Sequence, residues 1–285
     1  MRSFENFDLK KISTFKIGGT CELLCIIRDQ NDLLKALKEA KHRQLPIYIH
    51  GGGSNVVFEE THFQKAFLWM QNKHIQETES ELQVEAGCSW VELQRYCSEN
   101  DITGLEPLMT IPGTIGGAAY GNAGAFGMET LAMVNSVETI NLETHKLQKI
   151  DITDQYYSYR YSKLQKIPNS LIWKVNFAKN KMSEVHDLPA IKEKRDSSQP
   201  KGLTTGSFFK NPPNDYAGRL IEACGLKGFQ LGGAMISEKH ANFFMNVEQA
   251  SFDDIQNLAK LAQDKVFEKF CVKLEKEVHF VFAKD

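Results

Sequence analysis

The segment Ile111-Pro112-Gly113-Thr114-Ile115-Gly116-Gly117 is the most informative part of the sequence for the fold, and Asn122-Ala123-Gly124 follows it closely. Glycine lets the backbone turn through positive φ and lets a ligand approach the main chain. Successive N–H groups in such turns can bind phosphate oxygens. No Lys or Arg lies between Arg95 and Lys146, so a phosphate bound here would be held mainly by N–H and hydroxyl donors. A side chain at Gly116 or Gly117 is expected to occupy the space of that phosphate.

A second glycine cluster, Gly51-Gly52-Gly53-Ser54-Asn55-Val56, follows the apolar segment 47–50. Neither cluster matches the P-loop or the GxGxxG fingerprint. Ordinary turns are the alternative for both clusters, because glycine marks turns in most proteins. The segment 104–127 has more glycines than turns usually need, which favours a nucleotide-binding loop.

Composition and charge exclude several classes of protein. The net charge is −2 with acids and bases mixed along the chain, whereas a nucleic-acid-binding protein more often has a basic face. No apolar run reaches membrane-spanning length and residues 1–11 do not resemble a signal segment. The six cysteines are scattered without a CxxC pair, which predicts reduced thiols and no metal site. We expect a cytoplasmic monomer.

Hydrophobic periodicity predicts an α+β fold. Residues 29–45 have a helical stripe ended by Pro46, whereas 81–86 and 171–177 alternate like strands. Further predicted features are a strand at 47–50, capping boxes at Ser89–Glu92 and Ser251–Asp254, a helix over 215–224 stopped by Gly225, and a final strand over 272–282. The polar segment 187–200 is the predicted domain boundary.

Three further segments contain candidate reaction residues. In Gly206-Ser207-Phe208-Phe209-Lys210-Asn211-Pro212 the serine is either a turn residue or a hydroxyl in a dry pocket, and no GxSxG elbow surrounds it. Arg160 lies among Tyr156, Tyr157, Tyr159 and Tyr161, either on a packed edge or as a fixed guanidinium facing an anion. Near the C-terminus, Glu275, Glu277 and His279 share one strand face, where solvated carboxylates are the ordinary interpretation.

Together these segments resemble, in the same order over nearly the whole chain, the UDP-N-acetylenolpyruvoylglucosamine reductases of bacterial cell-wall synthesis. The resemblance implies an FAD-binding domain of the vanillyl-alcohol-oxidase/PCMH type with a smaller α+β substrate-binding domain. The short stretch between Arg160 and Ser207 resembles the compact form, which lacks an extra loop bearing a substrate-clamping tyrosine. The matching segments are 14–19, 51–57, 111–118, 122–127, 159–162, 206–212, 217–228, 237–243 and 274–278.

The resemblance also implies roles for individual residues. Ser207 would donate a proton, Arg160 and Glu277 would stabilise an enolate, and Glu275 is the alternative to Glu277. The substrate-binding residues would be Tyr159, Lys210 and Asn211, and His240 is either structural or lines the site. The residues implied to bind FAD are Gly51, Gly52, Gly53, Ser54, Asn55, Val56, Ile111, Pro112, Gly113, Thr114, Gly116, Gly117, Asn122 and Gly124.

The implied reaction is the NADPH-dependent reduction of UDP-N-acetylglucosamine enolpyruvate to UDP-N-acetylmuramate through bound FAD. We expect an FAD-binding domain over 1–186, with two subdomains that divide near residue 60. A substrate-binding domain over 187–270 and a final strand over 271–285 would follow. Two other classes remain open: another oxidase on the same flavin fold, and a nucleotide-binding module without enzymatic activity.

Overall fold

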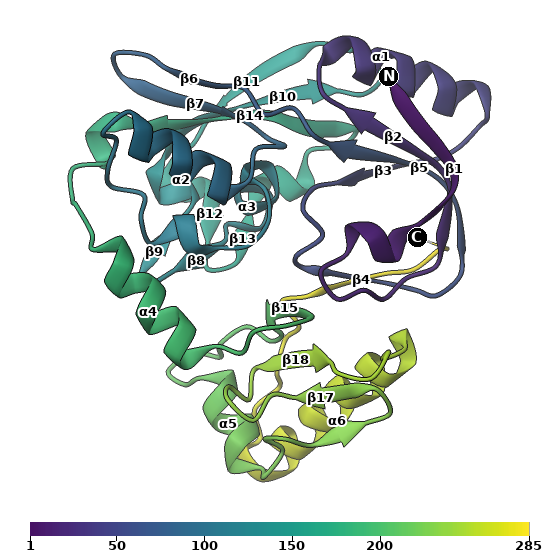
Figure 1. The fold of residues 1–285 in the computed structure, drawn as a ribbon, viewed down its shortest axis with the longest axis vertical. Helices are drawn as coiled ribbons and strands as arrows, with labels where there is room; N and C mark the ends of the chain where they lie inside the picture. Colours follow the sequence, from purple (N-terminus) through teal and green to yellow (C-terminus); the bar gives the residue numbers. More distant parts are fainter. Residues whose placement is uncertain (285) are drawn as a thin grey trace. The chain divides into compact units, whose positions relative to one another are not determined.

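The computed structural model describes residues 1–284, and the chain forms two compact units (Figure 1). Unit 1 consists of Met1–Glu5, Leu23–Gly52 and Lys65–Glu193, whereas unit 2 consists of Asn6–Glu22, Gly53–Gln64 and the chain from Lys194 onward. The first glycine cluster therefore contains a boundary, with Gly52 in unit 1 and Gly53 in unit 2.

Runs of consecutive strands, such as the five strands between residues 47 and 85, are separated by single helices, in agreement with an α+β fold. The α-helices are α1 (Gln30–His42), α2 (Trp90–Glu99), α3 (Ile115–Gly121), α4 (Leu188–Ser198), α5 (Ala217–Ala223) and α6 (Phe252–Phe270). Short 3₁₀ helices occupy Leu9–Ile12, Leu108–Thr110, Leu131–Met133, Asp154–Tyr156, Lys163–Lys166 and Lys179–Lys181. The strands are β1 (Arg2–Asp8), β2 (Thr20–Ile27), β3 (Ile47–His50), β4 (Val56–Phe58), β5 (His62–Met70), β6 (Ile75–Glu77), β7 (Glu81–Glu85), β8 (Gly124–Ala125), β9 (Met128–Glu129), β10 (Val134–Asn141), β11 (Leu147–Asp151), β12 (Tyr157–Ser158), β13 (Tyr161–Ser162), β14 (Ser170–Ala178), β15 (Thr204–Ser207), β16 (Gln230–Leu231), β17 (Ala234–Ile236), β18 (Phe243–Asn246) and β19 (His279–Val281).

Helix α1 shows why the predicted helix forms. The Asp29 side chain accepts a hydrogen bond from the backbone N–H of Asp32 at 2.7 Å, which caps the helix N-terminus. Its apolar stripe is buried in a cluster with side chains of β2 and β5. The buried residues of the stripe are Leu33, Ala36, Leu37 and Ala40. Strand β3 pairs in parallel with β5, within a sheet of order β1-β2-β5-β3.

A five-stranded antiparallel sheet of order β11-β10-β14-β7-β6 forms the rest of the unit 1 core. Figure 1 shows α2 and α3 on one side of this sheet. The capping box predicted for α2 is present: the Glu92 backbone N–H donates to Ser89, and the Glu92 carboxylate accepts from the Ser89 N–H. Trp90 and Ile115 are fully buried against Val84 and Val175 of the sheet.

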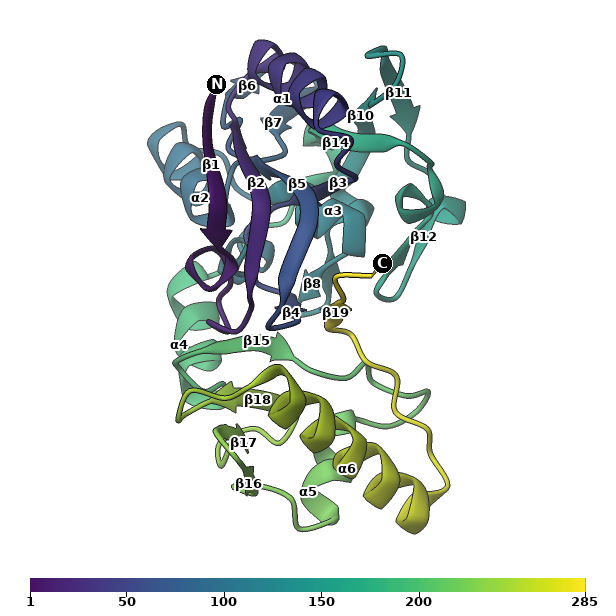
Figure 2. The ribbon, with the colours of Figure 1, turned by 90° about the vertical axis from the view of Figure 1, so that its right-hand side faces the viewer.

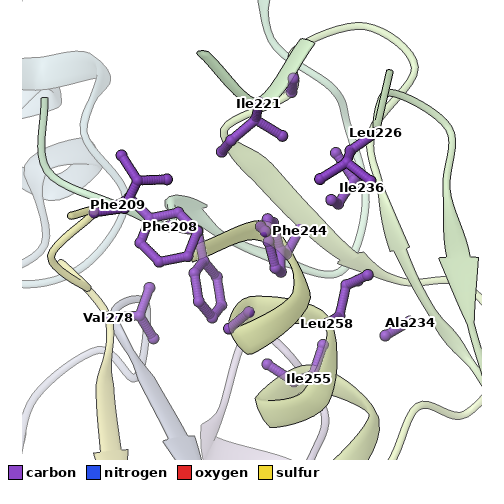
Figure 3. Packing of buried hydrophobic residues seen from close by; sticks show 14 of the residues in the cluster. Phe208, Phe209, Ile221, Leu226, Ala234, Ile236, Phe244, Ile255, Leu258 and Val278 are labelled. Atoms are coloured by element: carbon purple, nitrogen blue, oxygen red, sulfur yellow. The ribbon is translucent and has the colours of Figure 1, made fainter. Parts of the chain in front are cut away.

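Unit 2 contains an antiparallel sheet of order β15-β18-β17-β16 with α5 and α6 packed on it (Figure 2). Its apolar core includes Phe208, whose ring stacks on Phe244 with centroids 4.1 Å apart (Figure 3). Ile255 and Leu258 of α6 are fully buried in the same cluster. Burial of each such side chain stabilises the folded state by roughly 1.5–3 kcal/mol. Because Phe208 and Phe209 are buried in this cluster, the Ser207 segment is anchored to the core of unit 2.

The predicted final strand is shorter in the structure. Strand β19 covers only His279–Val281 and pairs in parallel with β4, not the whole of 272–282. The preceding residues instead run beside the Ser207 segment, with an isolated antiparallel bridge between Phe209 and Lys276. Local alternation could not reveal this change of partner, because it depends on a segment about seventy residues away in sequence.

Candidate active site

The two glycine segments meet in unit 1 through Gly51, Gly52, Gly113 and Thr114. A Cβ atom placed on Gly52 would lie 2.7 Å from the Cα of Gly113, and one on Gly51 would lie 2.6 Å from Thr114 Oγ1. Both distances are too short for a Cβ atom, and at Gly52 the clash is with backbone, so the close approach of the two backbones requires glycine there. Among residues 1–284, the N–H groups of Gly52 and Gly113 donate to no protein acceptor.

Thr114 and the following glycines begin helix α3. Thr114 Oγ1 accepts from the N–H of Gly117 at 3.4 Å, while the N–H of Gly116 donates to the carbonyl of Ala86 at 2.9 Å. A Cβ on Gly116 would lie 2.6 Å from the Cβ of Ala86, whereas Gly117 is exposed and its Cβ would meet only Thr114 Oγ1, at 3.4 Å. Packing of the helix against Ala86 therefore requires glycine at position 116. Of these two glycines, Gly117 is the one that leaves open space for a ligand.

These backbone features fit a flavin dinucleotide. A pyrophosphate needs donors that approach it closely, and exposed glycine backbone supplies them without a basic side chain. In this region Gly52 and Gly117 are exposed, and the Gly52 N–H has no protein acceptor among residues 1–284. The described residues contain no group of three or more His, Cys, Asp or Glu that could hold a metal ion.

The unit 2 part of the first glycine cluster is bonded to other segments of that unit. The carbonyl of Gly53 accepts from the N–H of Thr14 at 3.1 Å. Asn55 Nδ2 donates to the carbonyl of Glu277 at 3.0 Å, and the Asn55 carbonyl accepts from the N–H of His279 at 3.1 Å. The Asn55 amide thus binds the segment that carries Glu277, while the next residue, Val56, pairs with His279 in the β4–β19 ladder.

Arg160 lies at the turn between β12 and β13, with a left-handed φ of 55°. Its Nη2 donates to the carbonyl of Gly124 at 3.0 Å, and its guanidinium lies 4.9 Å from the centroid of the Tyr159 ring. Tyr159 is 44% exposed. Asn122, by contrast, is completely buried, with its amide bonded to protein groups.

Ser207 is the last residue of β15 and follows Gly206, whose φ is 80°. It is partly buried, and its hydroxyl makes no hydrogen bond to any group within residues 1–284. The neighbouring Phe208 and Phe209 are buried in the unit 2 core. The Ser207 hydroxyl is therefore attached to backbone that is anchored in the apolar core of unit 2.

Glu277 and Glu275 differ in how they are held. The Glu277 N–H donates to the carbonyl of Phe208 at 2.9 Å, and this residue is half-buried. Glu275 has a side chain that is 77% exposed and forms an ion pair with Lys210, with 3.6 Å between Oε2 and Nζ. The more enclosed position favours Glu277 over Glu275 as the reaction residue.

The predicted site residues therefore fall into two groups. Unit 2 brings together Ser207, Lys210, Asn211 and Glu277, with Asn55 and its neighbours beside them. Unit 1 holds the second glycine segment with Asn122, Gly124, Tyr159 and Arg160. The Asn211 side chain accepts from the N–H of Ala217 at 3.1 Å, at the start of α5.

One residue with a role in this site was not predicted. Asn242 is buried, and its side chain accepts from the N–H of Phe209 at 2.9 Å and donates to the Phe209 carbonyl at 2.8 Å. Its own carbonyl accepts from the N–H of Phe208 at 2.7 Å. The sequence signal that could have indicated this role is the Asn between apolar residues in Ala241-Asn242-Phe243. An amide buried there must form hydrogen bonds to other protein groups.

Comparison with known proteins agrees with this two-part arrangement. The sequence model of an FAD binding domain matches residues 22–150, and that of the UDP-N-acetylenolpyruvoylglucosamine reductase C-terminal domain matches residues 199–281. The chain is an FAD-dependent oxidoreductase, with a flavin-binding domain and a smaller C-terminal domain.

Relatives and a solved structure define its family. A UDP-N-acetylenolpyruvoylglucosamine reductase of Fusobacterium nucleatum is 34% identical over 99% of this chain and 100% of that protein. A UDP-N-acetylenolpyruvoylglucosamine reductase of Caldicellulosiruptor saccharolyticus is 35% identical over 96% of this chain and 90% of that protein. The crystal structure of the Thermus caldophilus enzyme superimposes with a TM-score of 0.79 at 26% identity and covers 98% of both chains. The chain belongs to the UDP-N-acetylenolpyruvoylglucosamine reductase family.

Proposed function

We propose that this enzyme reduces UDP-N-acetylglucosamine enolpyruvate to UDP-N-acetylmuramate with NADPH, through FAD. The observation that carries the proposal is the pairing of the Ser207 and Glu277 segments in unit 2, where the Glu277 N–H donates to the Phe208 carbonyl at 2.9 Å. A weakly acidic hydroxyl and a carboxylate are thereby held on neighbouring backbones. The Ser207 and Glu277 segments both lie within residues 199–281, which the family's C-terminal domain matches.

The residues that would hold FAD are mainly backbone donors of the two glycine segments. Bound FAD would supply the chemistry of hydride transfer between NADPH and the vinyl carbon of the enolpyruvyl group, and the protein supplies position and charge. Gly52 and Gly117 offer exposed backbone for the pyrophosphate. The proposed set is Gly51, Gly52, Gly53, Ser54, Asn55, Val56, Ile111, Pro112, Gly113, Thr114, Gly116, Gly117 and Gly124. The resemblance also implies Asn122, but both side-chain donors of Asn122 are bonded to protein groups.

The reacting substrate becomes an enolate, and three side chains act on it. Arg160 and Glu277 stabilise the developing charge, since a fixed planar guanidinium suits a carboxylate or an enolate oxygen. Ser207 then gives its hydroxyl proton to the enolate carbon, and a proton from solvent restores the hydroxyl. Lys210, Asn211 and Tyr159 are proposed to bind substrate.

The cellular role and domain roles follow from this activity. We propose a cytoplasmic monomer that makes a peptidoglycan precursor, with consequences for cell-wall biogenesis, cell shape and cell division. No helix among the described residues is long and apolar enough to cross a membrane. We also propose that 1–186 binds FAD, that 187–270 binds substrate and that 271–285 supplies Glu277. The FAD-binding match over 22–150 and the C-terminal match over 199–281 support this division.

The visible spectrum of the purified protein tests the proposed function. We expect flavin absorbance that bleaches on anaerobic addition of NADPH and returns on addition of the enolpyruvyl sugar. An oxidase of hydroxy acids or sugars would bleach with its own substrate and return with oxygen, and a binding module would show neither change. Recovery with oxygen but not with the UDP-sugar would therefore contradict the proposal.

A further inference from the structure

We propose that Asn122 is a positioning residue for Arg160, because it ties the hairpin that carries Arg160 to the end of helix α3. This inference rests on the proposed function, in which Arg160 stabilises the enolate. It gives Asn122 a different role from the flavin contact that the family resemblance implies. The contacts that carry it all lie within unit 1.

The side-chain amide of Asn122 is completely buried. Its Oδ1 accepts from the N–H of Leu131 at 3.0 Å. Its Nδ2 donates to Glu129 Oε2 at 3.0 Å and to the carbonyl of Ser158 at 2.9 Å. An Asn side chain has two N–H donors, so both are used by the protein and no donor is left for a cofactor.

The hairpin of β12 and β13 is bonded to the end of α3 through both of its strands. Ser158 ends β12, two residues before Arg160. On the other strand, the buried hydroxyl of Ser162 donates to the carbonyl of Tyr120, at the end of α3, at 2.9 Å. Both strands are thus bonded to residues 120–122, so the base of the hairpin is fixed on each side of Arg160.

Arg160 itself is bonded to the segment that follows Asn122. Its Nη2 donates to the carbonyl of Gly124, two residues beyond Asn122. A Cβ on Gly124 would lie 3.1 Å from Arg160 Nη1, so the guanidinium packs closely on this backbone. The segment that Asn122 anchors therefore also supplies the surface on which the guanidinium lies.

Position is decisive for a charged group at a transition state. A reaction site must be held within about 0.5 Å of its productive geometry, and a misplacement of about 1 Å can cost on the order of 10²-fold in rate. If the Ser158 anchor is lost, the guanidinium is expected to sample other positions. Only the step in which the enolate forms should then slow.

The backbone of Asn122 indicates the cleanest substitution. Its φ of 47° and ψ of 54° are left-handed, and its N–H donates to carbonyls of α3. Glycine adopts this conformation without steric cost, whereas alanine does not. Asn122→Gly therefore removes the amide and preserves the turn. Asn169→Gly is a matched control, because Asn169 has a φ of 48° and its Nδ2 donates to Glu143 on the exposed surface.

The experiment uses the full-length holoenzyme and follows both half-reactions by rapid-mixing absorbance. For Asn122→Gly we expect wild-type flavin content and wild-type reduction by NADPH. Reoxidation by the enolpyruvyl sugar should slow by ~10- to 100-fold. Asn169→Gly should behave like the wild type in both half-reactions. Loss of flavin from Asn122→Gly would show a cofactor role and overturn the inference.

A double-mutant cycle with Arg160→Ala separates this inference from the proposed function. If Asn122 acts through Arg160, adding Asn122→Gly to Arg160→Ala should slow reoxidation by less than about twofold further. Full additivity of the two substitutions would overturn the inference alone. Wild-type reoxidation in Arg160→Ala would overturn the proposed role of Arg160 as well.

A second variant keeps the proposal testable if Asn122→Gly does not fold. Ser162→Ala removes only the hydroxyl that donates to the Tyr120 carbonyl. It should also slow reoxidation, without loss of flavin, and the effect should disappear in the Arg160→Ala background. Wild-type reoxidation in a folded Ser162→Ala enzyme would contradict the idea that the hairpin base positions Arg160.

Discussion

The side chain of Asn242 binds both backbone polar groups of Phe209, accepting from its N–H at 2.9 Å and donating to its carbonyl at 2.8 Å. Together with the bond from the Phe208 N–H to the Asn242 carbonyl at 2.7 Å, this clamp fixes the backbone immediately after Ser207. The stacking of Phe208 on Phe244 fixes the same residues from the apolar side. Ser207 therefore projects from a segment with little freedom to move.

The rigidity of this segment gives a sharp prediction for Ser207. Ser207→Ala should leave FAD content and reduction by NADPH unchanged, because the substitution touches neither glycine segment. Turnover should fall by the ~10²–10⁴-fold usual for the loss of a general acid. Ser207→Cys should retain more activity than Ser207→Ala, since a thiol can still deliver a proton. Rapid-mixing absorbance would follow each half-reaction separately.

Measurements on Ser207→Ala also distinguish a catalytic role of the hydroxyl from a role in stability. The hydroxyl has no hydrogen-bond partner within residues 1–284, so its removal should leave the thermal unfolding temperature close to that of the wild type. If Ser207→Ala turns over at the wild-type rate, another group must donate the proton.

A second prediction compares Glu277 with Glu275. Glu277→Gln should slow reoxidation by ~10²–10³-fold, the usual cost of one preorganised charge contact at a transition state. Glu275→Gln is the matched control. Its carboxylate is 77% exposed and pairs with Lys210 at 3.6 Å, and such exposed pairs contribute little. It should change KM more than kcat, through Lys210. A larger loss of kcat in Glu275→Gln would reverse the two assignments.

Much of the fold could be predicted from local sequence signals. The Ser89–Glu92 and Ser251–Asp254 capping boxes both form, because a cap depends only on residues within one turn. The stripe in 29–45 became α1, which begins at Gln30 and ends at His42. The 272–282 prediction was wrong over most of its length, because backbone pairing with the Ser207 segment replaces a regular strand there.

The roles of site residues were harder to predict where the residue contacts other protein groups and not a ligand. The sequence could not separate Gly116 from Gly117, since only the position of Ala86 makes Gly116 a packing requirement. Asn242 looks like an ordinary polar residue, and Asn122 looks like a cofactor contact in a glycine motif, until their buried hydrogen-bond partners are known. The residues proposed to contact substrate, by contrast, lie in motifs that are recognisable without a structure.

A third prediction concerns the pH dependence of stability through His240. Burial is the main cause that lowers the pKa of His240 below 6.5, and its Nδ1 accepts from the N–H of Asn242 at 3.2 Å. The folded state thus favours the neutral ring, and below pH 6.5 the unfolded chain binds more protons. The stability that the neutral ring confers is complete above pH 6.5 and is lost as the pH falls through the lower pKa of the folded state.

Thermal unfolding measured between pH 7.5 and about pH 5, where an ordinary histidine becomes protonated, checks this. His240→Gln should flatten the decrease, because glutamine does not titrate. The pKa of the Asp215 carboxyl group is lowered from 3.8 to about 2, mainly by its hydrogen bond from Arg219. Its protonation therefore changes the stability only below the pH range of this experiment. An equally steep decrease in wild type and His240→Gln would assign the pH dependence to other groups.

The last prediction separates flavin binding from folding at Gly116 and Gly117. Gly117 lies on the exposed side of α3, where a Cβ would meet only Thr114 Oγ1, at 3.4 Å. Leucine favours helix over glycine by up to about 1 kcal/mol, so Gly117→Leu should unfold in the flavin-free state at or above the wild-type temperature. Its side chain would nevertheless enter the space proposed for the pyrophosphate. The purified variant should be pale, with a raised Kd for FAD.

Gly116→Ala should behave in the opposite way, because its Cβ would lie 2.6 Å from the Cβ of Ala86. Helix α3 must then move away from the end of β7, and overpacking of this kind typically costs about 1–3 kcal/mol. The flavin-free protein is the correct sample for both comparisons, since bound FAD raises the apparent stability by mass action. The unfolding temperature of flavin-free Gly116→Ala should therefore be lower than that of Gly117→Leu. If Gly117→Leu binds FAD as tightly as the wild type, the pyrophosphate does not lie on the exposed face of α3, and the flavin must be held by the first glycine segment.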